Sequence, residues 1–275
     1  MPALKDILKN KLTKKELLLL RTSFDAIGTI TVMEIPRELV KKQKVIAQAV
    51  LSLNKHIQTV AKKHGGHTGK YRTQKLTLLA GKRTKITEHK ESGLRMKLNV
   101  ETCYFSPRLV TERLRIASLV KPGENILVMF SGIAPYPLVL AKHSPARHIT
   151  GIEMNPAAHR YATENIALNK LTSKITLYKG NARTVVPTLS KKFDRIIMPL
   201  PKTGEQFLDI AVEKIKNGGT IHLYQFAQEG TFAQAEQSTL QQCTALGKKC
   251  TILRTVKAGQ HAPRQFRICI DVVVR

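Results

Sequence analysis

Four short segments carry side chains that could hold a nucleoside, and each follows or ends an apolar run that predicts a β-strand. Ser131 and Gly132 follow the first run, Glu153 ends the second, Asn181 follows the third and Pro199 closes the fourth. A carboxylate at a strand end can accept hydrogen bonds from two ribose hydroxyls, and a side-chain amide can bond the edge of an adenine ring. No GxxxxGK[ST] motif is present to hold phosphates, so the segments favour a nucleoside-bearing cofactor over ATP.

Each of these residues also has an ordinary structural explanation. Glycine is common in loops, an acid near a helix start is favoured by the helix dipole, and Gly180-Asn181 is a common turn pair. Pro199-Leu200-Pro201 stops both strand pairing and helix formation. It predicts either a plain strand-to-helix loop or a rigid backbone edge beside a flat substrate. The conjunction of four such segments is more specific than any one of them.

The elements that position these residues alternate from residue 107 onward. Apolar runs predict strands at 125–130, 148–154, 174–180, 193–200 and 220–226. Helical spacing predicts helices at 108–120, 136–143, 155–171, 204–219, where a glycine pair stops the helix, and 231–246. Alternation of this kind is typical of an α/β fold, with a mostly parallel sheet covered by helices on both faces. A terminal strand pair at 249–275 indicates an antiparallel addition at one edge.

The first hundred residues have a different pattern. A basic helical segment at 1–20 precedes a strand at 23–36 and a helix at 36–57. A glycine-rich basic loop at 64–74 leads into two or three antiparallel strands. We therefore expect a small α+β domain at 1–100 and a larger domain at 101–275.

Charge is the strongest clue in the composition. The chain of 275 residues has 46 Lys and Arg against 19 Asp and Glu, a formal net charge of +27. Such a surface suits a polyanionic partner, with solubility in a salt-rich or hot cytoplasm as the alternative. The absence of Trp and the 5% aromatic content argue against a base-stacking platform for single strands.

Other compositional features exclude several classes of protein. No run of 18 apolar residues predicts a transmembrane helix, and the first 20 residues lack a signal-peptide pattern, so we expect a cytoplasmic protein and no membrane partner. The four cysteines form no CxxC pair, so we expect neither a metal site nor a disulfide framework.

Several motifs together resemble the archaeal and eukaryotic tRNA guanosine-37 N1-methyltransferases. The resemblance runs from about residue 20 to the C-terminus, and its most specific part is the stretch from "FSPRL" to "ER". The motifs are "YFSPRLVTERLRIA", "FSGIAPYPLVLAK", "GIEMNPAAHRYATENIALNK", "DRIIMPLPKTGEQFLDIA" and "GGTIHLYQF". A sister family, the wyosine-pathway aminocarboxypropyl transferase, has similar motifs and acts on the same nucleoside.

The resemblance implies a class I methyltransferase fold that binds S-adenosylmethionine, preceded by the small domain, which helps to position the RNA. The implied substrate is the anticodon loop of tRNA, and we expect a monomer. Many members carry a further N-terminal domain that reads the outer corner of tRNA, and we expect this chain to lack it.

The resemblance also assigns roles to individual residues. Glu112 matches the acid that takes the proton from guanine N1, and Arg72 matches the arginine that stabilises charge on guanine O6. Pro201 matches the family proline beside the target base, and Pro199 precedes it. The implied cofactor contacts are Ser106 and Arg113 near the methionine end, Phe130, Ser131 and Gly132 in the first loop, Glu153 and Met154 at the ribose, and Asn181 and Ala182 at the adenine. The implied substrate contacts are Tyr104, Arg108 and Lys202.

Three positions depart from the family pattern. The family usually has Asp where this chain has Val128, and a second glycine where it has Ala134. Its "NLP" is Pro199-Leu200-Pro201 here, so the asparagine amide is missing. Two alternatives therefore stay open beside methyl transfer. One is transfer of the aminocarboxypropyl group, and the other is a protein that binds tRNA without catalysis.

Overall fold

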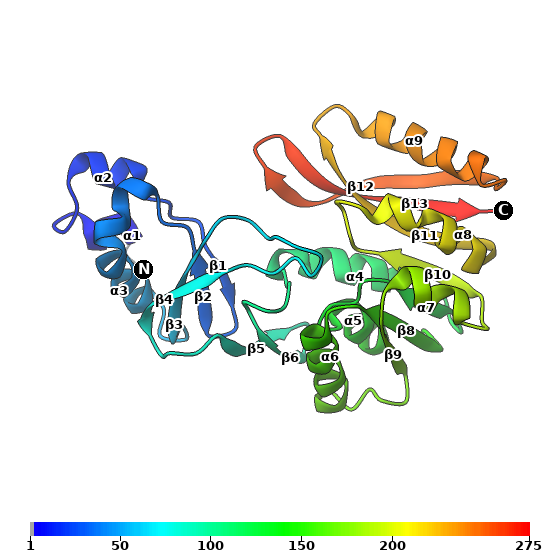
Figure 1. Cartoon of the computed structure of the whole chain (residues 1–275), viewed down its shortest axis with the longest axis horizontal. Helices are drawn as coiled ribbons and strands as arrows, with labels where there is room; N and C mark the ends of the chain where they lie inside the picture. The colour runs from blue at the N-terminus through cyan, green and yellow to red at the C-terminus, as the bar shows by residue number, and fades with distance from the viewer. Residues whose placement is uncertain (1–2) are drawn as a thin grey trace. The chain divides into compact units, whose positions relative to one another are not determined.

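The computed structural model describes residues 3–275, and these divide into two compact units between Pro107 and Arg108 (Figure 1). The first unit begins with α1 (Leu4–Leu8) and α2 (Lys14–Leu19). The predicted single helical segment at 1–20 is therefore two helices. The second one starts at Thr13, whose Oγ1 accepts from the Glu16 backbone N–H at 3.2 Å while the Glu16 carboxylate accepts from the Thr13 N–H at 2.7 Å. This reciprocal capping begins a new helix after the turn that follows α1.

The remaining elements of the first unit form two small sheets and a helix. The sheet order is β1-β2-β3-β4 in one and β5-β6 in the other. The strands are β1 (Asp25–Ile27), β2 (Ile30–Met33), β3 (Thr59–Lys63), β4 (Leu76–Gly81), β5 (Ile86–Glu91) and β6 (Leu94–Asn99), and the helices are η1 (Arg37–Lys42) and α3 (Gln43–Leu53). The predicted strand at 23–36 is a hairpin that turns at Gly28 with φ +54°, and the predicted helix at 36–57 begins as a 3-10 turn.

The second unit contains a seven-stranded sheet of order β12-β13-β11-β10-β7-β8-β9. The strands are β7 (Asn125–Val128), β8 (His148–Glu153), β9 (Ile175–Lys179), β10 (Phe193–Met198), β11 (Ile215–Gln228), β12 (Cys250–Ala262) and β13 (Gln265–Val274). Neighbours from β9 to β11 pair in parallel, and β13 pairs antiparallel with both of its neighbours. The chain moves outward from β7 to β9 and then returns to β10, so the topological switch point lies between β7 and β10. The predicted α/β fold with an antiparallel edge is confirmed.

Helices precede the first strand of this sheet and connect the later ones (Figure 1). They are η2 (Pro107–Leu109), α4 (Val110–Ser118), α5 (Pro135–His143), α6 (Pro156–Leu168), α7 (Ala182–Thr188), η3 (Gly204–Phe207), α8 (Leu208–Lys214) and α9 (Phe232–Ala245). The sequence analysis missed α7. It was also wrong about the end of the helix predicted at 204–219, because β11 already begins at Ile215. Gly218 and Gly219 lie in an irregular start of that strand, where a side chain at Gly219 would meet Ile215 at 2.7 Å.

Apolar side chains from β7, β10, β11 and β13 form the core of the second unit. Ile126, Leu127, Ile196, Leu223 and Ile270 are completely buried. Because both faces of β7 and β10 are covered, residues 126–128 and 196–198 are continuously apolar rather than alternating. Within residues 3–275, no helix combines the length and the apolarity that crossing a bilayer requires.

Candidate active site

Hydrogen bonds hold the loops after β7, β8, β9 and β10 together at one edge of the sheet. The Met129 N–H donates to the Ile197 carbonyl at 2.9 Å, and the Ser131 N–H donates to the Ile152 carbonyl at 2.8 Å. The Gly180 N–H donates to the Glu153 carbonyl at 3.0 Å. Because these strands are parallel, the edge is their shared carboxyl end, which is where open α/β sheets bind ligands.

The loop between β7 and α5 has an unusual backbone. Phe130, Gly132 and Ala134 have φ values of +57°, +58° and +70°. The left-handed region costs residues other than glycine about 1–2 kcal/mol each. Such strain persists only where the surrounding structure imposes it, and it clusters at ligand sites. Ala134 is the N-cap of α5 and is fully buried. Its positive φ gives a physical reason for the glycine that the family pattern has at this position.

Glu153 is the carboxylate that this loop organises. Its Oε2 accepts from the Gly132 N–H at 2.7 Å, and its Oε1 accepts from the Asn155 N–H at 2.6 Å. Burial raises the pKa of Glu153, and these backbone donors oppose that effect. A carboxylate has about four acceptor positions, and the backbone donors, which include Met154, leave one for a ligand hydroxyl. The residue therefore fits the ribose of a nucleoside cofactor.

Asn181 and Ser131 differ in how far their polar atoms are already used within the protein. The Asn181 Oδ1 accepts from the Arg183 N–H at 3.0 Å and caps α7, so one acceptor position of Oδ1 and the amide nitrogen are left for an adenine ring. The Ser131 hydroxyl is buried and has no hydrogen-bond partner within residues 3–275. It lies beside Gly151 in the sheet. Ala182 is buried and Met154 is half-buried, so both can contribute apolar contact.

The segment Pro199-Leu200-Pro201 forms a tight turn at the end of β10. The Leu200 N–H donates to the Met198 carbonyl at 2.8 Å, which makes Pro199 the central residue of a three-residue turn. A γ-turn of this kind uses a central φ close to the value that the proline ring fixes, and it needs no N–H from that residue. Pro201 is buried and Lys202 is exposed. The two prolines thus form a rigid edge at the same end of the sheet as Glu153.

Glu112 lies on α4 and is only 5% exposed. Its Oε1 accepts from the Tyr224 hydroxyl at 2.6 Å and from Arg115 Nη2 at 2.8 Å, and its Oε2 accepts from Arg115 Nε at 2.7 Å. Oε1 is filled by two donors. Oε2 has one, so among the described residues it is the oxygen that can still accept a proton.

A chain of buried polar groups continues from Arg115. Arg115 Nη1 donates to Asp271 Oδ2 at 2.8 Å, and Asp271 Oδ1 lies 2.6 Å from His222 Nδ1. His222 Nε2 lies 2.6 Å from Arg195 Nη1, and Arg195 forms an ion pair with Glu124. An arginine can only donate, so Nε2 of the imidazole must accept and Nδ1 must carry the hydrogen toward Asp271.

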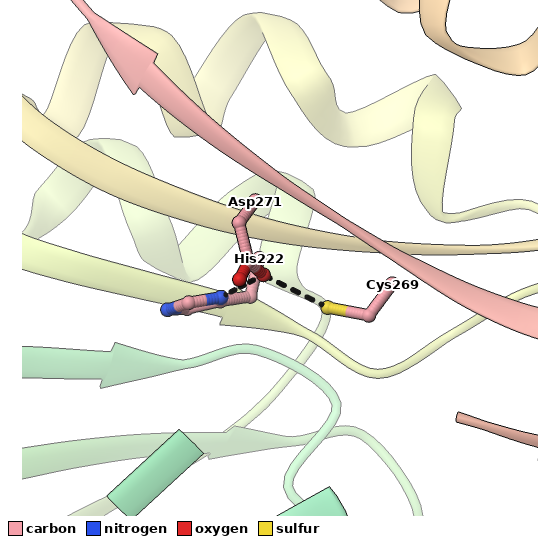
Figure 2. A group of neighbouring side chains, drawn as sticks. All are labelled: His222, Cys269 and Asp271. Atoms are coloured by element: carbon pink, nitrogen blue, oxygen red, sulfur yellow. Dashed lines mark hydrogen bonds and ion pairs between the residues drawn. The ribbon is translucent and has the colours of Figure 1, made fainter. Parts of the chain in front are cut away.

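His222, Cys269 and Asp271 are close enough for a metal site (Figure 2). Their atoms are already used, however. The tautomer given above occupies both ring nitrogens of His222, and Cys269 Sγ donates to Asp271 Oδ1 at 3.3 Å. Burial raises the pKa of the Cys269 thiol, which disfavours the thiolate that a metal needs. The cluster is better explained as part of the hydrogen-bonded chain.

The other predicted site residues divide between the two units. In the first unit, Arg72 has a φ of +52° and its guanidinium lies 5.4 Å from the centre of the Tyr104 ring, and Ser106 is half-buried. In the second unit, Arg108 is exposed in η2 and Arg113 is 1% exposed on α4.

Two protein domains match this chain in sequence. The TRM5/TYW2 methyltransferase domain matches residues 87–253, and the TYW2 N-terminal domain matches residues 4–84. The chain belongs to the TRM5/TYW2 methyltransferase family. The resemblance stated from the motifs is therefore confirmed, and the cofactor of this family is S-adenosylmethionine.

Relatives and solved structures in the TRM5/TYW2 family cover most of this chain. Trm5b of Pyrococcus abyssi, a tRNA (guanine(37)-N(1))-methyltransferase, is 38% identical over 253 residues, which are 92% of this chain and 74% of Trm5b. A complex of aTrm5 with tRNALeu has a TM-score of 0.86 at 29% identity, over 100% of this chain and 78% of aTrm5. The tRNA(Phe) (4-demethylwyosine(37)-C(7)) aminocarboxypropyltransferase of Methanocaldococcus jannaschii is 31% identical over 236 residues, which are 86% of this chain and 88% of that protein.

The residues that surround Glu112 in this member of the TRM5/TYW2 family were not predicted from the sequence. They are Arg115, Tyr224, His222 and Asp271. One signal was present, because Asp271 interrupts the apolar run "ICIDVVV" and a buried acid in a central strand needs a partner. His222 and Asp271 are direct cross-strand partners in β11 and β13, which the sequence alone does not reveal.

Acidification should destabilise the protein through His222. Burial lowers the pKa of His222 in the folded chain, whereas the unfolded imidazole binds a proton near pH 6.5. Between that pH and the lower pKa of the folded imidazole, the unfolded state binds a proton that the folded state lacks, so the free energy of unfolding falls with pH, by at most about 1.4 kcal/mol per pH unit for this group. Urea unfolding at pH 7.5, 6.5 and 5.5 measures this slope.

The variant His222→Gln provides the comparison, because glutamine keeps one donor and one acceptor but does not titrate. It should be less stable at pH 7.5 and should lose stability less steeply on acidification. Some slope should remain, because burial also lowers the pKa values of His148 and His159. Equal slopes in the two proteins would contradict the assignment to His222.

Proposed function

We propose that this protein transfers a methyl group from S-adenosylmethionine to N1 of guanosine 37 in the anticodon loop of tRNA. The observation that carries the proposal is Glu112, a buried carboxylate with one acceptor position left on Oε2. The activity of Trm5b of Pyrococcus abyssi and the tRNA bound to aTrm5 support the same substrate. The formal net charge of +27 suits a polyanion.

Guanine N1 carries a proton and is a poor nucleophile until that proton leaves. In the proposed reaction Oε2 of Glu112 accepts the proton, and the Arg72 guanidinium stabilises the negative charge that develops on O6. Bound S-adenosylmethionine supplies an electrophilic methyl group. Glu153 holds the ribose hydroxyls, and the turn at Pro199 and Pro201 limits the space beside the base.

A second candidate is transfer of the aminocarboxypropyl group from the same cofactor. Two observations favour it. The TYW2 N-terminal domain matches residues 4–84, and Pro199 replaces the asparagine of the "NLP" motif. The two reactions differ in which carbon of the sulfonium faces the nucleophile, so they leave different co-products.

Co-product analysis tests the proposal against this alternative. The protein is incubated with S-adenosylmethionine and an unmodified tRNA transcript that has G at position 37, and the reaction is followed by liquid chromatography and mass spectrometry. Methyl transfer yields S-adenosylhomocysteine in proportion to enzyme and tRNA. Methylthioadenosine would indicate aminocarboxypropyl transfer instead. Neither product, together with no calorimetric signal for S-adenosylmethionine, would favour a tRNA-binding protein without catalysis.

A further inference from the structure

The Glu112 carboxylate is held from one side by a pair of tyrosines. Tyr224 on β11 donates its hydroxyl to Glu112 Oε1 at 2.6 Å, and Tyr136 on α5 donates to the Tyr224 oxygen at 2.9 Å. Both tyrosines are at least 97% buried. The Tyr136 hydroxyl gives the Tyr224 oxygen its donor, so the Tyr224 hydrogen is directed at Glu112.

On the other side the carboxylate is held by a guanidinium that it shares. Arg115 donates to both oxygens of Glu112 and, through Nη1, to Asp271 Oδ2 at 2.8 Å. Asp271 is 1% exposed and is fixed in turn by His222. A guanidinium between two carboxylates is fixed in orientation. Its single positive charge is shared, so it neutralises neither carboxylate completely.

These contacts leave one acceptor position on the carboxylate. We propose that Tyr224 and Asp271, the latter through Arg115, are positioning residues. They direct the remaining lone pair of Glu112 Oε2 at the guanine N–H, and they adjust the negative charge on the Glu112 carboxylate. This inference rests on the proposed function. Tyr224 stabilises the ionised carboxylate by a hydrogen bond. Asp271 acts in the opposite direction on the charge of Glu112, because it adds a second negative charge and shares the arginine.

The charged and titratable groups around Glu112 determine the direction in which Tyr224 and Asp271 act on its negative charge. The titratable groups around Glu112 within the second unit are Arg115 on α4, Tyr136 on α5, Tyr224 on β11 and Cys269 on β13, and Arg115 links it to Asp271. Asp271 in turn contacts His222 on β11 and Arg254 on β12. Burial raises the pKa of both tyrosines and of the thiol, so these three stay neutral up to pH 8. Burial lowers the pKa of His222, and the Arg195 donor at its Nε2 favours the neutral ring. Asp271 is then the negative charge that shares Arg115 with Glu112.

The test is the pH dependence of the single-turnover rate of methyl transfer, measured by rapid quench from pH 4.5 to 8 with saturating cofactor and tRNA. Tyr224→Phe removes a donor from the ionised carboxylate, so the midpoint of the acid limb should move up by about one pH unit. Asp271→Asn removes a negative charge, so the midpoint should move down. A purely structural role predicts lower stability with no such opposite shifts.

Glu124→Gln is the matched control. It also removes a partly buried carboxylate from an ion pair, but Arg195, His222 and Asp271 separate Glu124 from Arg115. Its acid limb should keep the wild-type midpoint. Tyr224→Phe loses only one hydroxyl, so it decides the question even where Asp271→Asn fails to fold. A wild-type midpoint in Tyr224→Phe, or shifts in the same direction in both variants, would overturn the inference.

The Glu112→Gln variant separates this inference from the proposed function. A full single-turnover rate in that variant would remove Glu112 from the chemistry and the proposed mechanism with it. Loss of the rate in Glu112→Gln together with unmoved midpoints in Tyr224→Phe and Asp271→Asn would overturn the positioning roles alone.

Discussion

Glu112→Gln should lower the single-turnover rate of methyl transfer by about 10²–10⁴-fold, the usual contribution of a general base. Glutamine has nearly the same shape, and its amide oxygen can still accept from Tyr224 or Arg115. It cannot take the guanine proton. The affinity for tRNA should change little, because many cations contribute to it and this residue is buried. Rapid-quench kinetics and filter binding measure the two quantities on the same preparation.

A matched control for this variant is Glu164→Gln. Glu164 is exposed on α6, where its nearest ion pair is with Arg160 at 3.9 Å. This control should keep the wild-type rate. Thermal unfolding of both variants checks that the Glu112 effect is not a loss of fold. A single-turnover rate in Glu112→Gln equal to that of the control would mean that another group removes the proton.

Glu153→Gln should weaken the binding of S-adenosylmethionine by about ten- to a hundredfold. Hydrogen bonds to an ionised carboxylate contribute about 1.5–3 kcal/mol each, and about 1.4 kcal/mol corresponds to a factor of ten. The variant also loses charge where two backbone N–H groups, from Gly132 and Asn155, converge. Isothermal titration calorimetry without tRNA measures this effect separately from the chemistry.

The affinity for the cofactor should also depend on pH through Glu153. Burial raises its pKa, so the carboxyl becomes protonated at a higher pH than an exposed glutamate does. A protonated carboxyl has lost its charge and part of its acceptor capacity, so the dissociation constant should rise as pH falls. Titrations at pH 7.5, 6.5 and 5.5 should show this rise in the wild type and a flatter dependence in Glu153→Gln. A parallel dependence in both proteins would assign the effect to another group.

The parallel part of the fold could be predicted because its signal is local. Buried parallel strands are continuous apolar runs, and the runs ending near Phe130, Glu153 and Gly180 lie where the structure has β7, β8 and β9. The helix α7 was missed because its sequence, "ARTVVPT", combines β-branched residues with Pro187 in its last turn. The glycine pair before Thr220 suggested a helix stop, whereas tertiary pairing with β10 makes it part of a strand.

The candidate site could be predicted in its loops but not in its interior. Glu153 and Asn181 were visible because each directly follows or ends a strand. The partners of Glu112 were not, because they depend on which residues of β11 and β13 lie opposite one another. His222 pairs with Asp271 and Tyr224 with Cys269, and a shift of one residue would point these side chains to the other face. The turn around Pro199 could not be predicted either, because it is defined by the hydrogen bond from the Leu200 N–H to the Met198 carbonyl.

The most direct test of methyl transfer to guanosine 37 is nucleoside mass spectrometry on a modified transcript. Unmodified tRNA with G at position 37 is incubated with the protein and S-adenosylmethionine, then digested and mapped, beside a transcript with A at that position. We predict a gain of one methyl group at N1 of guanosine 37, and none in the A37 transcript. A methyl group at another position, or a heavier adduct at position 37, would contradict the proposed reaction and direct attention to the turn at Pro199.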